Sequence, residues 1–247
     1  MEKGEIEMLV SGKTDIGRRR EINQDNIFIS TEAVGNLPNL FIVADGMGGH
    51  KAGDYASRYA VETIVSSIKS GISQDVQSLI TKAILDANSN IVVKSATVDD
   101  YNGMGTTLVL TTIIDNKLIT ANIGDSRLYV IRGEKLEQIT EDHSLVAEML
   151  RQGKITADEA KEHPDRNIIT RAVGTSDYVI ADFFEYELDE ETYIMLCSDG
   201  LSNMLDEKEI VSIITNDDNL DVKTDNLIDR ANANGGNDNI SVILIKV

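Results

Sequence analysis

The sequence predicts an α+β fold in which at least one sheet is antiparallel. Its 247 residues are enough for a large core, and with two prolines and no low-complexity linker they predict a single domain over residues 1–247. Between residues 106 and 140, short apolar runs alternate with two-residue turns that are too short for a crossover helix. On either side of this region apolar residues recur at helical spacing, so amphipathic helices are also expected to contribute to the core.

The composition limits the partners and the location that the protein can have. The formal net charge of −19 argues against a nucleic-acid partner, which needs clustered lysine and arginine, and favours cations. No uncharged apolar stretch is long enough to span a bilayer, and the first residues lack the apolar core of a secretory signal. The single Cys197 excludes an internal disulfide and fits a reducing cytoplasm. We therefore expect a cytoplasmic protein with no membrane contact, acting as a monomer.

The N-terminal part of the sequence predicts three strands and then two helices. The strands are expected over residues 8–13, 26–29 and 40–45, the last being the continuous apolar run of a buried strand. A helix is expected over residues 54–69 and ends at Gly71. A second helix, capped by Ser73, carries an apolar stripe typical of core packing, formed by Val76, Leu79, Ile80, Ala83, Ile84, Ala87 and Ile91.

The middle of the sequence predicts an antiparallel meander. Its strands are expected over residues 106–114, 117–123, 127–132 and 136–139. Two helices should follow over residues 144–153 and 156–163, the second with Thr156 and Glu159 as a capping box. Because this last region is polar, we expect residues 144–171 to form a small flap subdomain that packs loosely on the body.

The C-terminal part predicts two strands separated by two helices. The apolar run over residues 193–197 and the final run over residues 240–247 are the expected strands. The helices are expected over residues 207–215, where Asp206 and Glu209 form the start, and over residues 222–233.

A glycine-rich turn follows the central apolar run at Asp45, Gly46, Gly48 and Gly49. Such a turn lets the backbone approach an ion or anion closely. A P-loop is excluded because Lys51 lacks the preceding glycine and the following hydroxyl, and a dinucleotide fingerprint would need a third glycine where Lys51 stands. A plain surface turn remains the simplest interpretation of this stretch taken alone.

The pattern of a carboxylate at the end of a strand is repeated along the chain. Asp125, Asp199 and Asp238 abut apolar runs as Asp45 does, and Asp25 precedes one. Carboxylates held together at strand ends repel one another unless cations lie between them, and oxygen ligands favour Mg²⁺, Mn²⁺ or Ca²⁺. A zinc site is not expected with three histidines and one cysteine. Any one of these aspartates could merely cap a turn, but that explanation is strained for all of them together.

Eight short motifs occur in a fixed order along the chain, at residues 17–25, 43–53, 105–107, 123–127, 142–144, 170–174, 198–200 and 236–241. Each motif alone is weak and the ordered set is specific. This ordered set resembles the metal-dependent protein phosphatase 2C family, in its bacterial form.

The resemblance implies an αββα sandwich, two antiparallel sheets flanked by helix pairs, with a cleft at the sheet ends that holds two Mn²⁺ or Mg²⁺ ions. By motif position, Asp45 would bridge both ions and the carbonyl of Gly46 would bind one. Asp199 and Asp238 would hold the other, with Gln24 and Asp25 contributing directly or through water. Asp125 matches a residue that, with Asp199, binds a third and weaker ion.

The resemblance also implies a serine/threonine phosphatase in which a metal-bridged hydroxide attacks phosphorus without a covalent intermediate. Arg20 matches the arginine that contacts the phosphate, which leaves Arg18 and Arg19 as surface charges. Met47 stands where many eukaryotic relatives carry a histidine proposed as the general acid, and His50 is the candidate acid here. Gln24 replaces a glutamate that is found in many relatives.

The resemblance implies that the partners are phosphorylated proteins, namely a serine/threonine kinase and the targets of that kinase. The flap would help to determine which of these substrates are bound.

Two other interpretations remain to be tested. A non-catalytic relative could use the same fold for regulated binding, although its ligand positions would be expected to degenerate. The segment 235–238 could be a Ca²⁺ turn of repeat type, but it occurs once and such repeats need several copies. Cys197 is a poor candidate nucleophile, because it ends a buried strand and has no arginine loop to cradle a phosphate.

Overall fold

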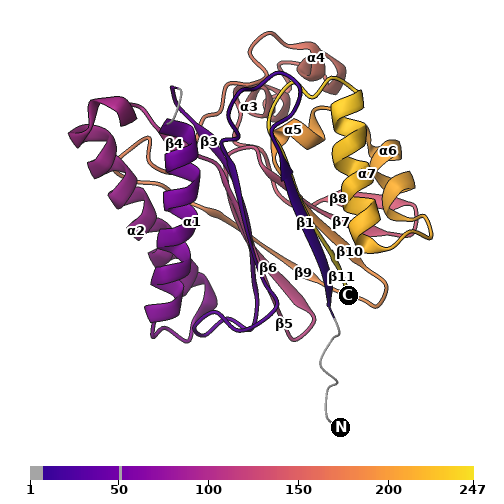
Figure 1. Ribbon diagram of the computed structural model, residues 1–247, viewed down its shortest axis with the longest axis horizontal. Coiled ribbons are helices and arrows are strands. Elements are labelled where there is room, and N and C mark those ends of the chain that lie inside the picture. Colours follow the sequence, from indigo (N-terminus) through magenta and orange to yellow (C-terminus); the bar gives the residue numbers. More distant parts are fainter. Residues whose placement is uncertain (1–7, 50–51) are drawn as a thin grey trace.

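The computed structural model describes residues 8–49 and 52–247. They form four layers, in which two antiparallel sheets stack face to face between two layers of helices (Figure 1). This confirms the predicted αββα sandwich. The first sheet has the order β1-β11-β10-β7-β8, formed by Leu9–Asp15, Ile240–Lys246, Tyr193–Cys197, Arg127–Arg132 and Lys135–Gln138. The second has the order β2-β3-β5-β6-β9, formed by Asp25–Ser30, Leu40–Met47, Leu108–Ile114, Lys117–Ile123 and Asp182–Glu187, with β4 (Gly105–Thr106) paired to β3.

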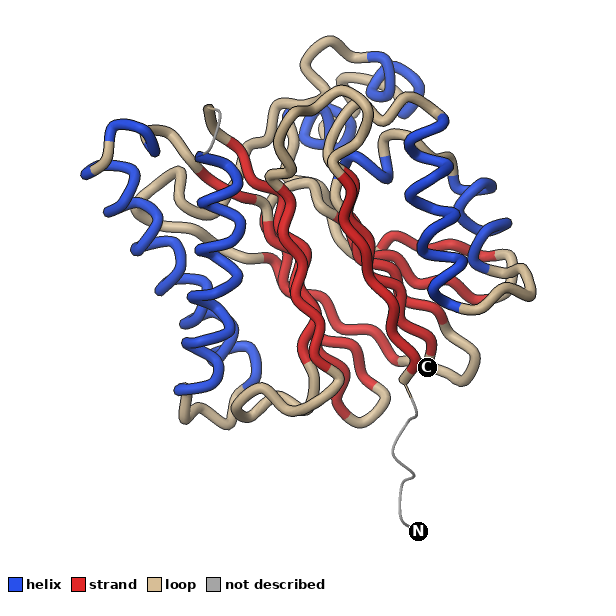
Figure 2. Tube along the Cα trace, viewed as in Figure 1, coloured by secondary structure: helices blue, strands red, loops and turns tan. Residues whose placement is uncertain are grey.

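The helices cover the two outer faces. The long helices α1 (Ala52–Ser70) and α2 (Val76–Thr97) pack on the second sheet, and a 3₁₀ turn over Asp99–Tyr101 follows them. The first sheet is covered by α5 (Asp199–Ser202), α6 (Glu207–Ile214) and α7 (Leu220–Ala233). The short helices α3 (Leu145–Arg151) and α4 (Ala157–Glu162) lie at the end of the molecule that also holds the ends of β3 and β10 (Figure 2).

Strand β3 shows how the sequence produces these layers. Successive side chains of a strand point to opposite faces, so Phe41 and Val43 enter the core between the two sheets while Ile42 and Ala44 pack under α1 and α2. Both faces are buried, which explains why the strand is a continuous apolar run instead of an alternating one. Asp45 continues the face of Phe41 and Val43, and it therefore lies where the space between the sheets opens.

The predicted meander is wrong in one respect. Strands β5 and β6 form a hairpin in the second sheet, whereas β7 and β8 form a hairpin in the first. The chain passes from one sheet to the other at Gly124, whose φ of 99° is open to glycine, and at Asp125. The alternation of apolar residues fixes which faces of a strand are buried, but it does not say which sheet the strand joins.

Most helix limits follow the sequence signals closely. The capping boxes of Thr156 with Glu159 and of Asp206 with Glu209 are confirmed. Ser73 was expected to cap α2, but the N-cap residue is Asp75. Its carboxylate accepts a hydrogen bond from the Ser78 backbone amide at 2.8 Å. The Ser73 hydroxyl instead accepts from the Asp75 amide, one step earlier in the same turn.

Strand β9 and helix α5 were not predicted. Strand β9 is an edge strand with three acidic residues in its sequence and little burial, so it lacks the pattern of a core strand. Helix α5 is a single turn that begins at Asp199. As expected for residues 144–163, no residue of α3 or α4 is buried.

Within the described part of the chain, none of the helices combines the length and the apolar character needed to cross a membrane.

Candidate metal centre

Five aspartates lie at the same end of the two sheets, and we call them the carboxylate cluster: Asp25, Asp45, Asp125, Asp199 and Asp238. Asp25 begins β2 and is the register partner of Asp45 near the end of β3. Asp125 follows β6, Asp199 follows β10, and Asp238 precedes β11. Each of the carboxyl groups of Asp25, Asp45, Asp125 and Asp199 has its pKa raised in part by the charge of at least one other member.

Asp25 is the most enclosed member of the cluster. Its side chain is 5% exposed, and the Ser198 hydroxyl of the opposite sheet donates a hydrogen bond to its Oδ2 at 2.7 Å. The Ser198 hydroxyl in turn accepts from the Ser241 amide at 2.9 Å, which fixes it between β10 and β11. The Oδ1 of Asp25 is buried and has no hydrogen-bond partner among the described residues.

Asp45 is held in place by hydrogen bonds of its backbone. Its amide donates to the Thr107 hydroxyl at 2.9 Å, and its carbonyl accepts from the Thr107 amide and the Thr106 hydroxyl. The next residue has no room for a side chain, because a Cβ on Gly46 would lie 2.0 Å from the carbonyl oxygen of Gly53. Glycine is therefore required for the close approach of β3 to the start of α1.

Asp199 begins the short helix α5, and Ser198 is its N-cap residue. The side-chain Nδ2 of Asn203 donates to Asp199 Oδ2 at 3.0 Å, while Oδ1 is buried without a hydrogen-bond partner in the described structure. Asp238 lies on the facing loop, where the Asn239 amide donates to its Oδ1 at 2.8 Å. Its other oxygen pairs with Arg20 Nη2 at 2.7 Å, so the predicted phosphate-contacting arginine lies directly beside the cluster.

The turn that carries Asp125 is braced by a residue that we did not single out from the sequence. Gly124 donates its amide to Nδ1 of His143 at 3.0 Å, and its carbonyl accepts from the His143 amide at 3.0 Å. The other ring nitrogen of His143 pairs with Asp182, which also accepts from Arg171. Burial lowers the pKa of His143, which keeps the neutral ring needed to accept at Nδ1.

The cluster is electrostatically strained when it holds neither protons nor cations. Desolvation is the main cause that raises the pKa of Asp25 and that of Asp125, each to about 7. Desolvation and then the charge of Asp25 raise the pKa of Asp45 well above its ordinary value. Desolvation and the neighbouring Asp238 raise the pKa of Asp199 as well. A divalent cation would relieve this repulsion at neutral pH.

The donor set fits hard cations. Carboxylate oxygens are the ligands that Mg²⁺ and Mn²⁺ prefer. The Oδ1 atoms of Asp25 and Asp199, which have no hydrogen-bond partner in the described structure, are available as such ligands. Among residues 8–49 and 52–247, no three His, Cys, Asp or Glu side chains already form a complete ligand group around one point. This is compatible with Mg²⁺, which keeps several waters and takes few carboxylates directly.

Other predicted residues fall at or outside this centre. Arg18 and Arg19 are exposed, as expected for surface charges. Cys197 is buried, and desolvation raises the pKa of its thiol to about 12, so it is not a nucleophile at neutral pH. The candidate acid His50 lies outside the described residues.

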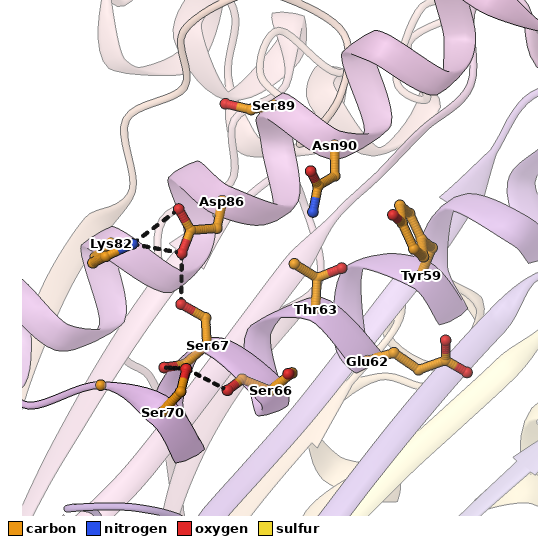
Figure 3. A pocket seen from close by; sticks show the side chains of 11 residues that line it. Tyr59, Glu62, Thr63, Ser66, Ser67, Ser70, Lys82, Asp86, Ser89 and Asn90 are labelled. Atoms are coloured by element: carbon orange, nitrogen blue, oxygen red, sulfur yellow. Dashed lines mark hydrogen bonds and ion pairs between the residues drawn. The ribbon is translucent and has the colours of Figure 1, made fainter.

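The hydroxyls of Thr107 and Ser198 were not identified from the sequence. Both stand inside motifs that were recognised, next to a predicted strand end, and this adjacency is the signal that could have found them. A cavity of about 570 Å³ between α1 and α2 is unrelated to the centre, since none of the five aspartates lines it (Figure 3).

Comparison with known proteins shows the family of the chain. The model of the protein phosphatase 2C family matches residues 14–243, which include all five aspartates. The chain belongs to the protein phosphatase 2C family. As a member of this family it is a phosphoprotein phosphatase.

Relatives in the family match the chain over nearly its whole length. It is 42% identical over 240 residues to the serine/threonine phosphatase Stp of Listeria monocytogenes. The alignment covers 95% of this chain and 94% of that protein. The crystal structure of Stp1 from Staphylococcus aureus has a TM-score of 0.91 and 35% identity, with 100% of this chain and 97% of the other covered. The catalytic domain of the phosphatase PstP, solved with two manganese ions, has a TM-score of 0.84 and 29% identity, with 97% of each chain covered.

Proposed function

We propose that this phosphatase hydrolyses phosphoserine and phosphothreonine in proteins and depends on Mn²⁺ or Mg²⁺ for the reaction. The observation that carries the proposal is the carboxylate cluster beside Arg20. Carboxyl groups with raised pKa values and partnerless oxygens make a binding site for divalent cations, and a guanidinium next to them makes a binding site for a phosphate.

The proposed ligands are the residues that match the motifs of the family. The charges of Asp25, Asp199, Asp125 and Asp238 all raise the pKa of Asp45, and this supports Asp45 as the residue shared by two ions. The Gly46 carbonyl and Asp25 would complete the site on the second sheet, and Asp199 and Asp238 the site on the first. Asp125, with Asp199, would hold a third and weaker ion.

When bound, the two ions would supply the nucleophile by lowering the pKa of a water between them to give a hydroxide, so that no covalent intermediate is needed. Arg20 would orient the phosphate through the planar fork of its guanidinium. Since Arg20 now pairs with Asp238, the arrival of a phosphate would exchange one anionic partner for another without moving the arginine far. The role of His50 as proton donor stays a prediction.

The substrates proposed are the targets of a serine/threonine kinase, together with the kinase itself. The flap over residues 144–171 offers an exposed surface next to the centre, since neither of its helices contains a buried residue. We propose that this region, as part of a single domain, contributes to substrate choice.

The test is release of phosphate from phosphoserine and phosphothreonine peptides at several Mn²⁺ concentrations, with and without chelator. Asp45→Asn and Asp199→Asn should abolish Mn²⁺-dependent turnover while circular dichroism remains unchanged. Asp217→Asn is the matched control, because Asp217 is an exposed loop residue outside the cluster. Turnover retained in both cluster variants, or unaffected by chelator, would contradict the proposal.

A further inference from the structure

Asn239 is a buried amide that ties together the two ends of the loop carrying Arg20. Its side chain is 3% exposed. Its Nδ2 donates to the carbonyl of Ile16 at 2.9 Å and to that of Ile22 at 3.0 Å, and its Oδ1 accepts from the Gln24 amide at 2.9 Å. Residues 16–24 form the connection between β1 and β2, so one side chain fixes this connection near its start and at its end.

The backbone of Asn239 contacts the centre on its other side. Its amide donates to Asp238 Oδ1 at 2.8 Å. Its carbonyl packs against the residue after Asp199, because a Cβ added to Gly200 would lie 1.9 Å from that oxygen. Asn239 therefore contacts the loop of Arg20, Gln24 directly before β2, the carboxylate of Asp238 and Gly200 directly after Asp199.

The loop has further backbone ties to the same segment. The amides of Arg18 and Arg19 both donate to the carbonyl of Gly236, at 2.7 and 3.2 Å. The side chain of Arg20, by contrast, forms an ion pair with Asp238 in which both side chains are partly exposed. Ion pairs that are exposed to solvent contribute little to stability. The position of Arg20 must therefore be fixed by the backbone of its loop. Within the described structure, Asn239 is the only residue of the C-terminal segment whose side chain forms hydrogen bonds to both Ile16 and Ile22.

We propose that Asn239 is a positioning residue, which holds Arg20 and Asp25 in register with Asp238 and Asp199. The inference rests on the proposed function, because it assigns to Asn239 the placement of the phosphate-binding arginine. An amide is the side chain suited to this position, since it offers one acceptor for the Gln24 amide and two donors for two carbonyls. Aspartate has the same shape but has no donors when ionised, so it would face both carbonyls without a hydrogen bond.

The first test measures the loop directly. Trypsin cleaves after arginine, and residues 18–20 offer three such sites. In the intact protein the loop should resist cleavage, and Asn239→Asp should accelerate cleavage within it by about tenfold, since loss of buried hydrogen bonds favours local opening. Asn237→Asp is the matched control, because it adds the same charge two residues away at an exposed position. Equal cleavage rates in all three proteins would overturn the proposal.

The second test measures phosphate recognition. Asn239→Asp should raise KM for a phosphothreonine peptide more than it lowers kcat, as expected when an anchoring group for the phosphate is displaced. In a double-mutant cycle, Asn239→Asp should have little further effect on KM once Arg20 is alanine, because both changes remove the same contact. Independent effects of the two substitutions would overturn the assignment to Arg20. Titration calorimetry with Mn²⁺ alone measures any accompanying loss of metal affinity.

The third test uses the wild-type protein and does not depend on whether any variant folds. Hydrogen exchange of the wild-type protein should show strong protection of the Gln24 amide, which donates to Asn239 Oδ1. Exchange of this amide at the unprotected rate would overturn the proposal even if Asn239→Asp failed to fold. Proteolysis and exchange report the loop whether or not the protein hydrolyses phosphopeptides, so a failure of the proposed function and a failure of this inference are distinguishable.

Discussion

Asp25 and Asp45 are register partners across β2 and β3, and the pKa of each is raised mainly because its own carboxyl group is taken out of water, and further by the neighbouring carboxylates. Their side chains lie on the face of each strand that enters the space between the two sheets. The sandwich is thus apolar in its interior and acidic at one end. The first prediction follows from this relationship.

We expect Asp45→Asn to stabilise the metal-free protein, and more so at pH 7.5 than at pH 5. A raised pKa in the folded state means that folding takes up protons between about pH 4 and the folded pKa, so the contribution of Asp45 to stability falls as pH rises through this window. Urea unfolding in chelator at the two pH values measures the difference. With Mn²⁺ the order should reverse, since the asparagine removes a charged ligand. A metal-free variant less stable than wild type at both pH values would contradict this.

Arg20→Ala should raise KM for a phosphothreonine peptide by about tenfold or more, because a charge-assisted hydrogen bond to the phosphate is lost. Arg20→Lys should fall between this variant and wild type, since lysine keeps the charge but not the planar fork. Steady-state kinetics at saturating Mn²⁺ provides the measurement. Arg19→Ala serves as the control, because Arg19 is an exposed neighbour. The same loss in Arg19→Ala would indicate a general effect of charge.

Ser198→Ala should weaken Mn²⁺ binding by about tenfold, because the hydroxyl that orients Asp25 from the opposite sheet is removed. Titration calorimetry with Mn²⁺ gives the affinity without an activity assay. Ser202→Ala is a close control, as its buried hydroxyl has no hydrogen-bond partner in the described structure. Unchanged affinity in Ser198→Ala would show that Asp25 does not depend on this hydrogen bond.

Gly46→Ala should destabilise the protein by about 2 kcal/mol or more, because its Cβ would overlap the Gly53 carbonyl and force β3 away from α1. Thermal unfolding would detect the change. Gly49→Ala should have a small effect, since a Cβ there meets no atom within 4 Å. Equal midpoints for Gly46→Ala and wild type would mean that this contact is relaxed in solution.

The sequence predicts strands best where an apolar run is long and ends abruptly. The limits of Tyr193–Cys197 and Lys117–Ile123 match the structure, and the carboxylates that end or precede such runs form the cluster. Strand β9 escaped because an edge strand exposes much of its surface and can carry charges that a central strand excludes.

Local sequence patterns do not show which distant residues contact one another in the fold. The division of the expected meander between two sheets depends on the turn at Gly124 and on packing that no neighbouring residue encodes. The same holds for Asp25 and Ser198, which come from different sheets and are 173 residues apart. The motifs predict a role for each aspartate, but the hydroxyls and amides that bond to the aspartates are visible only in the folded structure.

The pairing of β1 with β11 joins Leu9 to Lys246 and continues through seven residue pairs to Asp15 and Ile240. Because closing so large a loop has a high entropic cost, this pairing is expected to form late during folding. The segment from Gly236 to Asn239 precedes β11 directly, so the acidic end of the sandwich is completed by the same event. A nascent or partly folded chain without this pairing would lack a complete acidic end, and catalytic competence would report that the whole polypeptide has been assembled.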